Sequence, residues 1–262
     1  NSIETDGREK KDGSAADPKG VDAAIFSKGN LTLRGSGSAN IKAANRGIVA
    51  KGELIVADGI FDLRTEDDIF CGKESVTLQG GAVRASAQGD KGKGVSSDGA
   101  VILSGGSYVF AHTSEGIEGK TIEMSGGSFD ISADDDGMNA REHYDKEETK
   151  TKKKEANPEV WIRIAGGELY VTAGGDGLDS NGDLIFSGGT SYINGSDTGK
   201  DAALDWNGSC RVDGGVLIAS GMKARAEKIS TESAQPFFEW ELKSEHPARE
   251  QISVQRGDGS VL

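Results

Sequence analysis

The sequence predicts an all-β chain folded as a parallel β-helix, a solenoid of about eight coils. Two observations carry this prediction: an excess of glycine without proline, and a strand-like phrase that recurs along the chain. The 262 residues include 39 glycines but only 4 prolines, so glycine is about twice as frequent as the roughly 7% of an average protein. Glycine without proline, and without a three-residue period, excludes collagen and indicates many turns between short strands.

The recurring phrase has two parts, a corner and a Gly-Gly turn. The corners, each followed by an apolar residue, stand at Ala24, Gly47, Asp68, Gly94, Gly116, Gly137, Gly177 and Ala203. The Gly-Gly turns begin at Gly80, Gly105, Gly126, Gly166, Gly188 and Gly214. The corners recur every 21 to 26 residues, with one interval of 40. A unit of this length holds about three short strands and three turns, which is one coil of a parallel β-helix.

Stacking the units produces four columns of mainly apolar residues. Before the Gly-Gly turn they are Leu31, Leu54, Val76, Val101, Ile122, Ile162, Leu184 and Cys210, then Leu33, Val56, Leu78, Leu103, Met124, Ile164, Phe186 and Val212. After the turn they are Phe61, Val83, Tyr108, Phe129, Leu169, Ser191 and Leu217, then Leu63, Ala85, Phe110, Ile131, Val171, Ile193 and Ala219. Alternation with a period of two predicts strands with one buried face.

The repeat divides the chain into three parts. Residues 1–21 are a polar N-terminal segment, residues 22–221 form the β-helix, and residues 222–262 follow it. The long interval contains a polar, lysine-rich insertion at 141–159, which we expect to be solvated. The last part is expected to cap the solenoid or pack on its side, because a solenoid end exposes core and unpaired backbone. Strands are expected there at 237–242 and 251–255.

The charge balance limits the possible partners. Asp and Glu number 43 against 30 Lys and Arg, which gives a formal charge of −13. Such a charge disfavours nucleic acids and anionic membranes and favours cations. The apolar runs are only a few residues long, so no membrane insertion is expected.

An acidic column carries the candidate chemistry. Two residues after each corner stand Phe26, Val49, Phe70, Ser96, Glu118, Asn139, Asp179 and Asp205. This column is apolar in the first three units and acidic or amide in the last four. Just before the corner glycine stand Glu115, Asp136 and Asp176, with Asp134, Asp135 and Asp201 beside them. Parallel coils would stack these side chains about 4.8 Å apart, and stacked like charges destabilise a sheet.

Calcium is the cation that best relieves this repulsion. It binds six to eight oxygens at about 2.3–2.6 Å, so oxygens of neighbouring coils can share one ion, whereas magnesium fits less well. Zinc would require His or Cys ligands, and the three histidines form no cluster. We expect more than one Ca²⁺, with ligands drawn from Glu115, Glu118, Asp135, Asp136, Asn139, Asp176, Asp179, Asp201 and Asp205. The alternative is that Asp and Asn merely satisfy the backbone of turns.

Several side chains are candidates for contact with sugars. A bound calcium ion has open valences that carboxylate sugars could fill. Tyr170 and Tyr192 are adjacent in an outward-facing column after the Gly-Gly turn and are expected to form a flat strip, while Trp206 stands beside Asp205. Arg163 and Arg211 complete the candidate set. The alternative is that each aromatic ring packs against a loop or the cap.

Four phrases resemble a known family. They are Glu-Gly-Ile-Glu-Gly (115–119), Asp-Asp-Gly-Met-Asn-Ala (135–140), Asp-Gly-Leu-Asp-Ser-Asn-Gly-Asp-Leu (176–184) and Ala-Ala-Leu-Asp-Trp-Asn-Gly (202–208). With the repeated Ser-Gly-Gly, they resemble bacterial secreted carbohydrate-binding domains that have a pectate-lyase-like, right-handed parallel β-helix. The resemblance covers about residues 22–221. It implies secretion or display on a bacterial cell surface, bound calcium, and affinity for cellulose or acidic plant polysaccharide such as polygalacturonate.

The chain departs from that family in its lysine-rich insertion and in the absence of acidic turns from its first three units. Calcium is therefore expected only in the C-terminal half.

Three functions remain open. The first is calcium-dependent binding of plant cell-wall polysaccharide without catalysis, and the second is a calcium-dependent, pectate-type polysaccharide lyase. A lyase needs a base near the calcium ion, and Arg163, Arg211 and Lys200 are candidates that no motif singles out. The sequence therefore favours a protein that is not an enzyme. The third function is a structural or adhesive stalk in which calcium only stiffens the solenoid.

Overall fold

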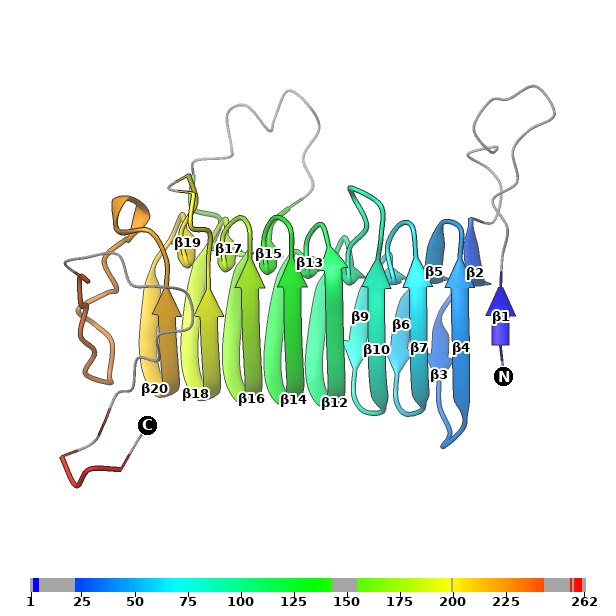
Figure 1. The fold of residues 1–262 in the computed structure, drawn as a ribbon, viewed down its shortest axis with the longest axis horizontal. Helices are drawn as coiled ribbons and strands as arrows, with labels where there is room; N and C mark the ends of the chain where they lie inside the picture. The colour runs from blue at the N-terminus through cyan, green and yellow to red at the C-terminus, as the bar shows by residue number, and fades with distance from the viewer. Residues whose placement is uncertain are drawn as a thin grey trace.

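A computed structural model describes residues 2–4, 22–142, 155–198, 200–242, 255 and 257–260. It confirms an all-β parallel solenoid of about eight turns, whose coils lie side by side along the long axis (Figure 1). The one helical element among the described residues is a short 3₁₀ turn, η1 (Lys223–Arg225). No helix in these ranges has the length and apolar character needed to cross a membrane.

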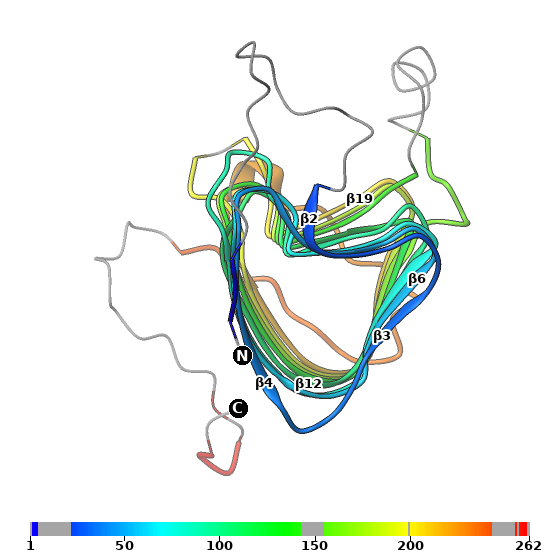
Figure 2. The same cartoon turned by 90° about the vertical axis from the view of Figure 1, so that its right-hand side faces the viewer.

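The smaller sheet takes one short strand from each coil, and it lies along the top of the coils when they are viewed end-on (Figure 2). Its strands are β2 (Ala23–Ser27), β5 (Arg46–Ala50), β8 (Phe70–Gly72), β11 (Val95–Ser96), β13 (Ile117–Gly119), β15 (Met138–Ala140), β17 (Leu178–Ser180) and β19 (Leu204–Trp206).

The larger sheet wraps the other two sides of each coil. In the first three coils these sides are separate strands: β3 (Leu31–Leu33), β4 (Ser38–Ala43), β6 (Glu53–Val56), β7 (Ile60–Thr65), β9 (Ser75–Leu78) and β10 (Ala82–Ala87). In later coils one bent strand covers both sides: β12 (Ala100–Thr113), β14 (Thr121–Ala133), β16 (Trp161–Ala173), β18 (Asp183–Asn194) and β20 (Cys210–Ser220). An edge strand, β1 (Ser2–Glu4), pairs in parallel with β4.

The long strands bend at their Gly-Gly pairs. The second glycine of each pair has a φ between +76° and +88°, a left-handed conformation that side chains disfavour. The first glycine lies against the preceding coil: a Cβ built on Gly188 would sit 2.3 Å from the carbonyl oxygen of Ala165. The glycine excess therefore reflects both backbone conformation and the close approach of stacked turns.

The predicted core is confirmed over most of its length, but Ala219 in the last coil is exposed, and Leu31, Leu33, Phe61 and Leu217 are only partly buried. Each of the four columns pairs in the expected register from coil to coil. Most of these side chains are fully buried, including Cys210 at 1% exposure. Because parallel pairing stacks identical positions, aromatic residues also meet, as where Tyr108 and Phe129 stack with ring centroids 4.9 Å apart.

The register expected for the third corner was wrong by one residue. Phe70 pairs with Ile48 and Val95 in the inward column, and Cys71 instead pairs with Ser96 in the acidic column. This corner has no glycine, and Ile69 takes the place that glycine occupies in other coils, hydrogen-bonded through its carbonyl to the N–H of Ile48. Without glycine as a marker, the sequence alone did not fix the alignment of this coil.

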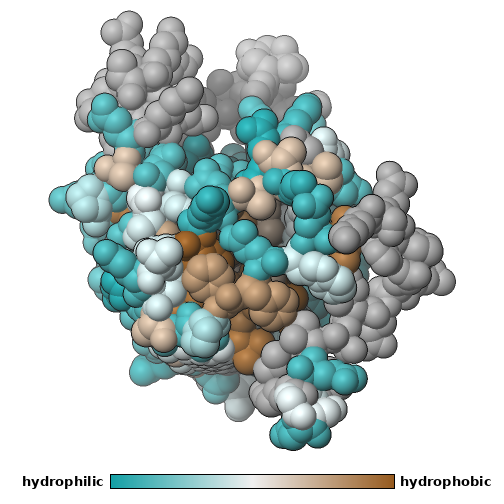
Figure 3. Space-filling view, turned by 90° about the vertical axis from the view of Figure 1, so that its left-hand side faces the viewer, coloured by the Kyte–Doolittle hydropathy of each residue, from teal (hydrophilic) through white to brown (hydrophobic). Residues whose placement is uncertain are grey.

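The segment after β20 covers the open edge of the last coil. Ser230 N–H donates to the Cys210 carbonyl (2.8 Å), and Gln235 N–H donates to the Val212 carbonyl (3.0 Å). Apolar side chains still gather in the middle of this end face (Figure 3). The capping role expected for residues 222–262 stays a prediction.

The strand expected at 237–242 does not form. Phe238 and Trp240 are each 70% exposed, and no strand is assigned to this stretch. Residues 251–254, most of 1–21 and most of the insertion at 141–159 lie outside the described residues.

We predict that Gly188→Ala lowers the free energy of unfolding by about 1–3 kcal/mol, because the added methyl group must displace backbone of the adjacent coil. Urea denaturation measures the loss. Gly37→Ala is the control, since nothing lies within 4 Å of a Cβ at that position. Equal effects of the two substitutions would contradict this explanation of the Gly-Gly turns.

Candidate functional site

Two polar columns run along the corner that leads into the smaller sheet. One is fixed by strand pairing and contains Cys71, Ser96, Glu118, Asn139, Asp179 and Asp205. The other stands just before the corner and contains Asp68, Lys93, Glu115, Asp136, Asp176 and Ala202, as the backbone hydrogen bonds between coils show. The sequence-predicted acidic residues thus stack, but Lys93 lies among them.

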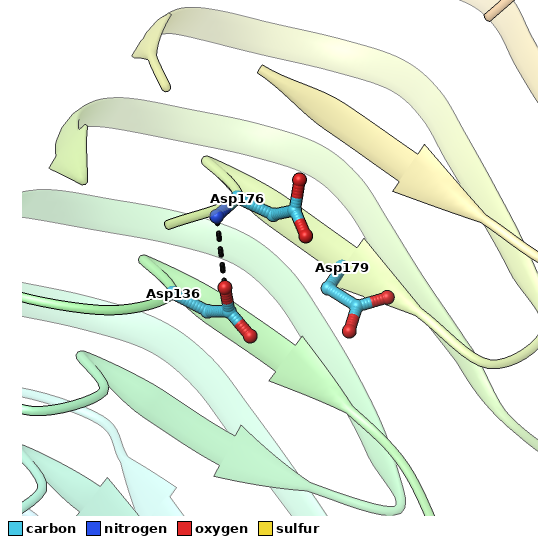
Figure 4. A group of neighbouring side chains, drawn as sticks. All are labelled: Asp136, Asp176 and Asp179. Atoms are coloured by element: carbon cyan, nitrogen blue, oxygen red, sulfur yellow. Dashed lines mark hydrogen bonds between the residues drawn. The ribbon is translucent and has the colours of Figure 1, made fainter. Parts of the chain in front are cut away.

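Part of the acidic column satisfies the backbone of the next coil. Asp136 Oδ1 accepts the N–H of Asp176 at 2.8 Å (Figure 4). Asp176 Oδ1 accepts the N–H of Ala202 in the same way, and Asp68 Oδ1 accepts that of Lys93 at 3.1 Å. One oxygen of Asp68, Asp136 and Asp176 therefore does hydrogen-bond to the backbone of a turn, which was the alternative to metal binding. The second oxygen of each carboxylate remains for other contacts.

Three aspartates from two coils converge. Single carboxylate oxygens of Asp136, Asp176 and Asp179 all lie within 4.8 Å of one another, and the three side chains face a common space in Figure 4. Asn139 lies beside them: its Nδ2 donates to Asp136 Oδ2 at 3.1 Å. Its Oδ1 is buried and has no hydrogen-bond partner among the described residues.

Burial and mutual repulsion make these carboxylates weak acids. Desolvation, reinforced by the charge of Asp179, raises the pKa of Asp136 to about 8. Desolvation and the charge of Asp205 raise the pKa of Asp179 to about 7. For Asp176, desolvation is again the main cause of a pKa near 6. Arg141 acts in the opposite direction on Asp179, but among the described residues no cation brings the pKa values of the three carboxyl groups back to the ordinary range.

This arrangement fits a calcium ion. Its donors are all oxygens, and oxygens that share one calcium ion at about 2.3–2.6 Å lie no more than about 5 Å apart. The unpartnered Asn139 Oδ1 adds a neutral oxygen ligand of the kind calcium accepts. Gly175 leaves room, because a Cβ there would lie 2.6 Å from Asp136 Oδ1.

The expected pair Glu115 and Glu118 has a different environment. Lys93 Nζ lies 2.5 Å from Glu118 Oε1 and 3.4 Å from Glu115 Oε2, and Arg141 Nε donates to Glu118 Oε2 at 2.6 Å. Burial would raise the pKa of Glu118, but hydrogen bonding to Glu115 and the two cations lower it to about 2. Burial and its hydrogen bond to Glu118 raise the pKa of Glu115 to about 7.

Lys93 and Arg141 were missed by the sequence reasoning, and they provide Glu118 with the positive charge expected from calcium. Their positions in the repeat could have revealed them. Lys93 stands in the acidic column itself, one coil before Glu115, and Arg141 directly follows β15.

The remaining predicted ligands occupy less central places. Asp205 pairs with Asp179 in the next coil. Ala202 occupies the pre-corner position of that coil, and Asp201 lies next to it in the sequence, beside the column as expected. Asp135 is exposed beside the cluster. Asp135 and Asp201 both help to raise the pKa of Asp176.

The predicted sugar contacts divide into two groups. Tyr170 and Tyr192 pair across β16 and β18, and their rings stack with centroids 5.2 Å apart and planes 8° apart, instead of forming a flat strip. Tyr170 is 42% exposed. Trp206, by contrast, is buried in the core cluster, so the expectation of an accessible Trp206 ring is corrected.

The two arginines are already engaged. Arg211 Nη2 lies 2.5 Å from Asp213 Oδ2. The Arg163 guanidinium lies 4.7 Å from the ring centroid of Trp161, an aromatic residue that the sequence reasoning did not single out.

The chain matches a family model described as carbohydrate-binding domain-containing protein over residues 1–202 and again over residues 88–234. The chain belongs to this carbohydrate-binding family. Two overlapping matches are expected of a repeat, because one model can align to the coils in more than one register. No curated protein and no solved structure was found to match the chain.

We predict that the metal-free protein loses stability as the pH rises from about 5 to about 8. The pKa values of Asp136, Asp176 and Asp179 are raised on folding, so the folded state holds protons that the unfolded chain has released, and folding is favoured at the lower pH. Urea midpoints measured in chelator at the two pH values test this. Asp136→Asn should flatten the dependence, whereas an equally steep dependence in that variant would contradict the assignment.

Proposed function

We propose that this chain is a secreted or cell-surface bacterial module that binds plant cell-wall polysaccharide without catalysis, with calcium holding its coils together. Its membership of a carbohydrate-binding family supports the binding role. The observation that carries the calcium proposal is the group of carboxylate oxygens from Asp136, Asp176 and Asp179 within 4.8 Å. The polymer is cellulose or an acidic polysaccharide such as polygalacturonate, as the family resemblance implies.

Calcium would be held by Asp136, Asp176, Asp179 and the Oδ1 of Asn139, with Asp205 in the adjoining coil. When bound, the ion supplies positive charge that offsets the repulsion between coils. Asp136 and Asp176 are only 9% and 8% exposed, so an ion among them would serve mainly to hold the coils in register. Glu115 and Glu118 are left out of this site because Lys93 and Arg141 already balance them.

The placement of basic side chains supports binding rather than lyase chemistry. A lyase needs a neutral base close to the sugar and the metal ion. Of the three candidate bases, Arg211 is held by Asp213, Arg163 lies over the ring of Trp161, and Lys200 is exposed. Lys93 and Arg141, the cations beside the acidic column, are held by Glu118. Release of unsaturated products from polygalacturonate in calcium, followed by ultraviolet absorbance, would contradict a non-catalytic role.

We predict that Asp179→Ala abolishes most of the calcium-induced rise in melting temperature. In chelator the variant should be at least as stable as the parent protein, because it removes one of several repelling carboxylates. Differential scanning calorimetry with and without calcium measures both effects. Asp90→Ala, an exposed aspartate in the turn after β10, is the control and should keep the full calcium response. An equal fall in the melting temperature of Asp179→Ala in calcium and in chelator would indicate that the carboxylate stabilises only the local turn and binds no ion.

We predict that the protein binds insoluble cellulose or immobilised polygalacturonate in calcium and releases most of it in chelator, because loosened coils no longer present an ordered surface. Depletion of protein from solution over a range of polysaccharide concentrations gives the affinity in each condition. Absence of binding to either polymer in calcium would instead favour a structural stalk.

A further inference from the structure

The outer surface of β4, β7, β10 and the C-terminal halves of β12, β14, β16, β18 and β20 forms one continuous face, here named the front face. These strands stand as a row of parallel arrows in Figure 1. Its central column is Asn40, Asp62, Arg84, Val109, Asp130, Tyr170, Tyr192 and Ile218, each paired with the next. A ligand that follows this column runs along the solenoid axis.

The front face differs from the rest of the chain in its charge. Its central column and the outward columns on either side carry three acidic and three basic side chains, so the face is neutral although the chain has a charge of −13. These are Asp62, Asp130, Glu168, Lys42, Arg64 and Arg84. Many other outward positions are hydroxyl or amide residues, such as Ser107, Ser128 and Thr190. Such a surface matches an uncharged, hydroxyl-rich ligand.

A depression of about 470 Å³ lies at the N-terminal end of the front face. Its lining includes Ser38, Asn40, Ile60, Asp62, Arg84 and Ser107. Asp62 and Arg84 form no ion pair or side-chain hydrogen bond with another described residue, so their polar groups are available to a ligand. Ile60, 56% exposed, adds an apolar surface, and this mixture of apolar and polar lining is typical of ligand sites.

The stacked Tyr170 and Tyr192 rings lie on the same column, toward the other end. Three strand steps separate Arg84 from Tyr170, or roughly 14 Å at about 4.8 Å per step, and six steps separate Asn40 from Tyr192, or roughly 29 Å. Val109 and Asp130 are the residues between Arg84 and Tyr170 in this column. An extended chain lying on the column could therefore contact the depression and the tyrosines together.

We propose that an uncharged, extended glycan binds lengthwise on the front face, with the depression as one subsite and the tyrosine stack as another. Asp62, Arg84 and Asn40 exchange hydrogen bonds with sugar hydroxyls, and Tyr170, which is 42% exposed, supplies an aromatic contact and a hydroxyl group to a sugar ring. This inference rests on the proposed polysaccharide-binding function and specifies its surface and ligand class. The calcium site lies at a different part of the coil, the corner before the smaller sheet.

Isothermal titration calorimetry of the calcium-loaded full chain with cellohexaose and cellobiose tests the proposal. Cellohexaose should bind much more tightly than cellobiose, because only the longer chain can reach both subsites. Arg84→Ala and Tyr170→Ala should each weaken cellohexaose binding by roughly fivefold or more and remove most of the advantage of length. Lys51→Ala, which removes an exposed positive charge next to β5 in the smaller sheet, should bind like the parent protein. Melting temperatures equal to the parent's would show that the variants are folded.

Three results would overturn the proposal. Unchanged cellohexaose affinity in both front-face variants would place the glycan elsewhere and leave the binding function intact. Binding of polygalacturonate but of no uncharged glycan would also leave that function intact and exclude the ligand class. Failure of the parent protein to bind any of these polymers would remove the proposed function together with the front-face site.

Discussion

In-register parallel stacking is the constraint on which the rest of this molecule depends. Each residue of a coil meets its equivalents in the neighbouring coils, about 4.8 Å away. A column must therefore consist of side chains that can pack against similar side chains in the neighbouring coils. Apolar columns become a continuous core, and glycine columns allow turns to approach closely, with a hypothetical Gly188 Cβ only 2.3 Å from the Ala165 carbonyl oxygen. Tyrosines stack ring on ring, as Tyr170 and Tyr192 do.

Acidic residues are the exception to this tolerance, since stacking them costs free energy. The protein relieves the repulsion in two ways along a single corner. Around Glu118 it supplies Lys93 and Arg141 from the coils on either side. Around Asp136, Asp176 and Asp179 the neighbouring ligand atoms are other oxygens, and the pKa values of the three carboxyl groups are raised, so that these groups are less fully ionised. This contrast between neighbouring coils favours a cation from solution beside Asp136, Asp176 and Asp179. The stability of the solenoid would then depend on the concentration of that cation.

Most of the fold could be predicted from the sequence because apolar alternation and glycine pairs recur in every coil. Four core columns were assigned correctly across the solenoid, including the unusual Cys210. The prediction failed at the third corner, which has Ile69 in place of the glycine that marks the other corners. Phe70 was therefore assigned to the column that Cys71 occupies. The stretch at 237–242 was expected to be a strand but is not one, because strand formation depends on packing and pairing with neighbours that lie outside the local sequence.

The site was predicted in part for the same reason. Stacking brought Asp136, Asp176 and Asp179 together as the columns implied. The columns did not reveal the direction of long side chains, so the reach of Lys93 and Arg141 to Glu118 was missed. They also did not distinguish a buried ring from an exposed one, which is why Trp206 was expected at the surface. Side-chain direction at the ends of short strands depends on packing that a repeat alignment does not contain.

The most direct test of this account is a crystal structure of the protein grown in calcium. A calcium ion is expected at the corner, about 2.3–2.6 Å from oxygens of Asp136, Asp176 and Asp179, with the Oδ1 of Asn139 turned toward it. Saturating calcium with only water among these aspartates, and with the coils packed as described above, would contradict the claim that an external cation balances the acidic column.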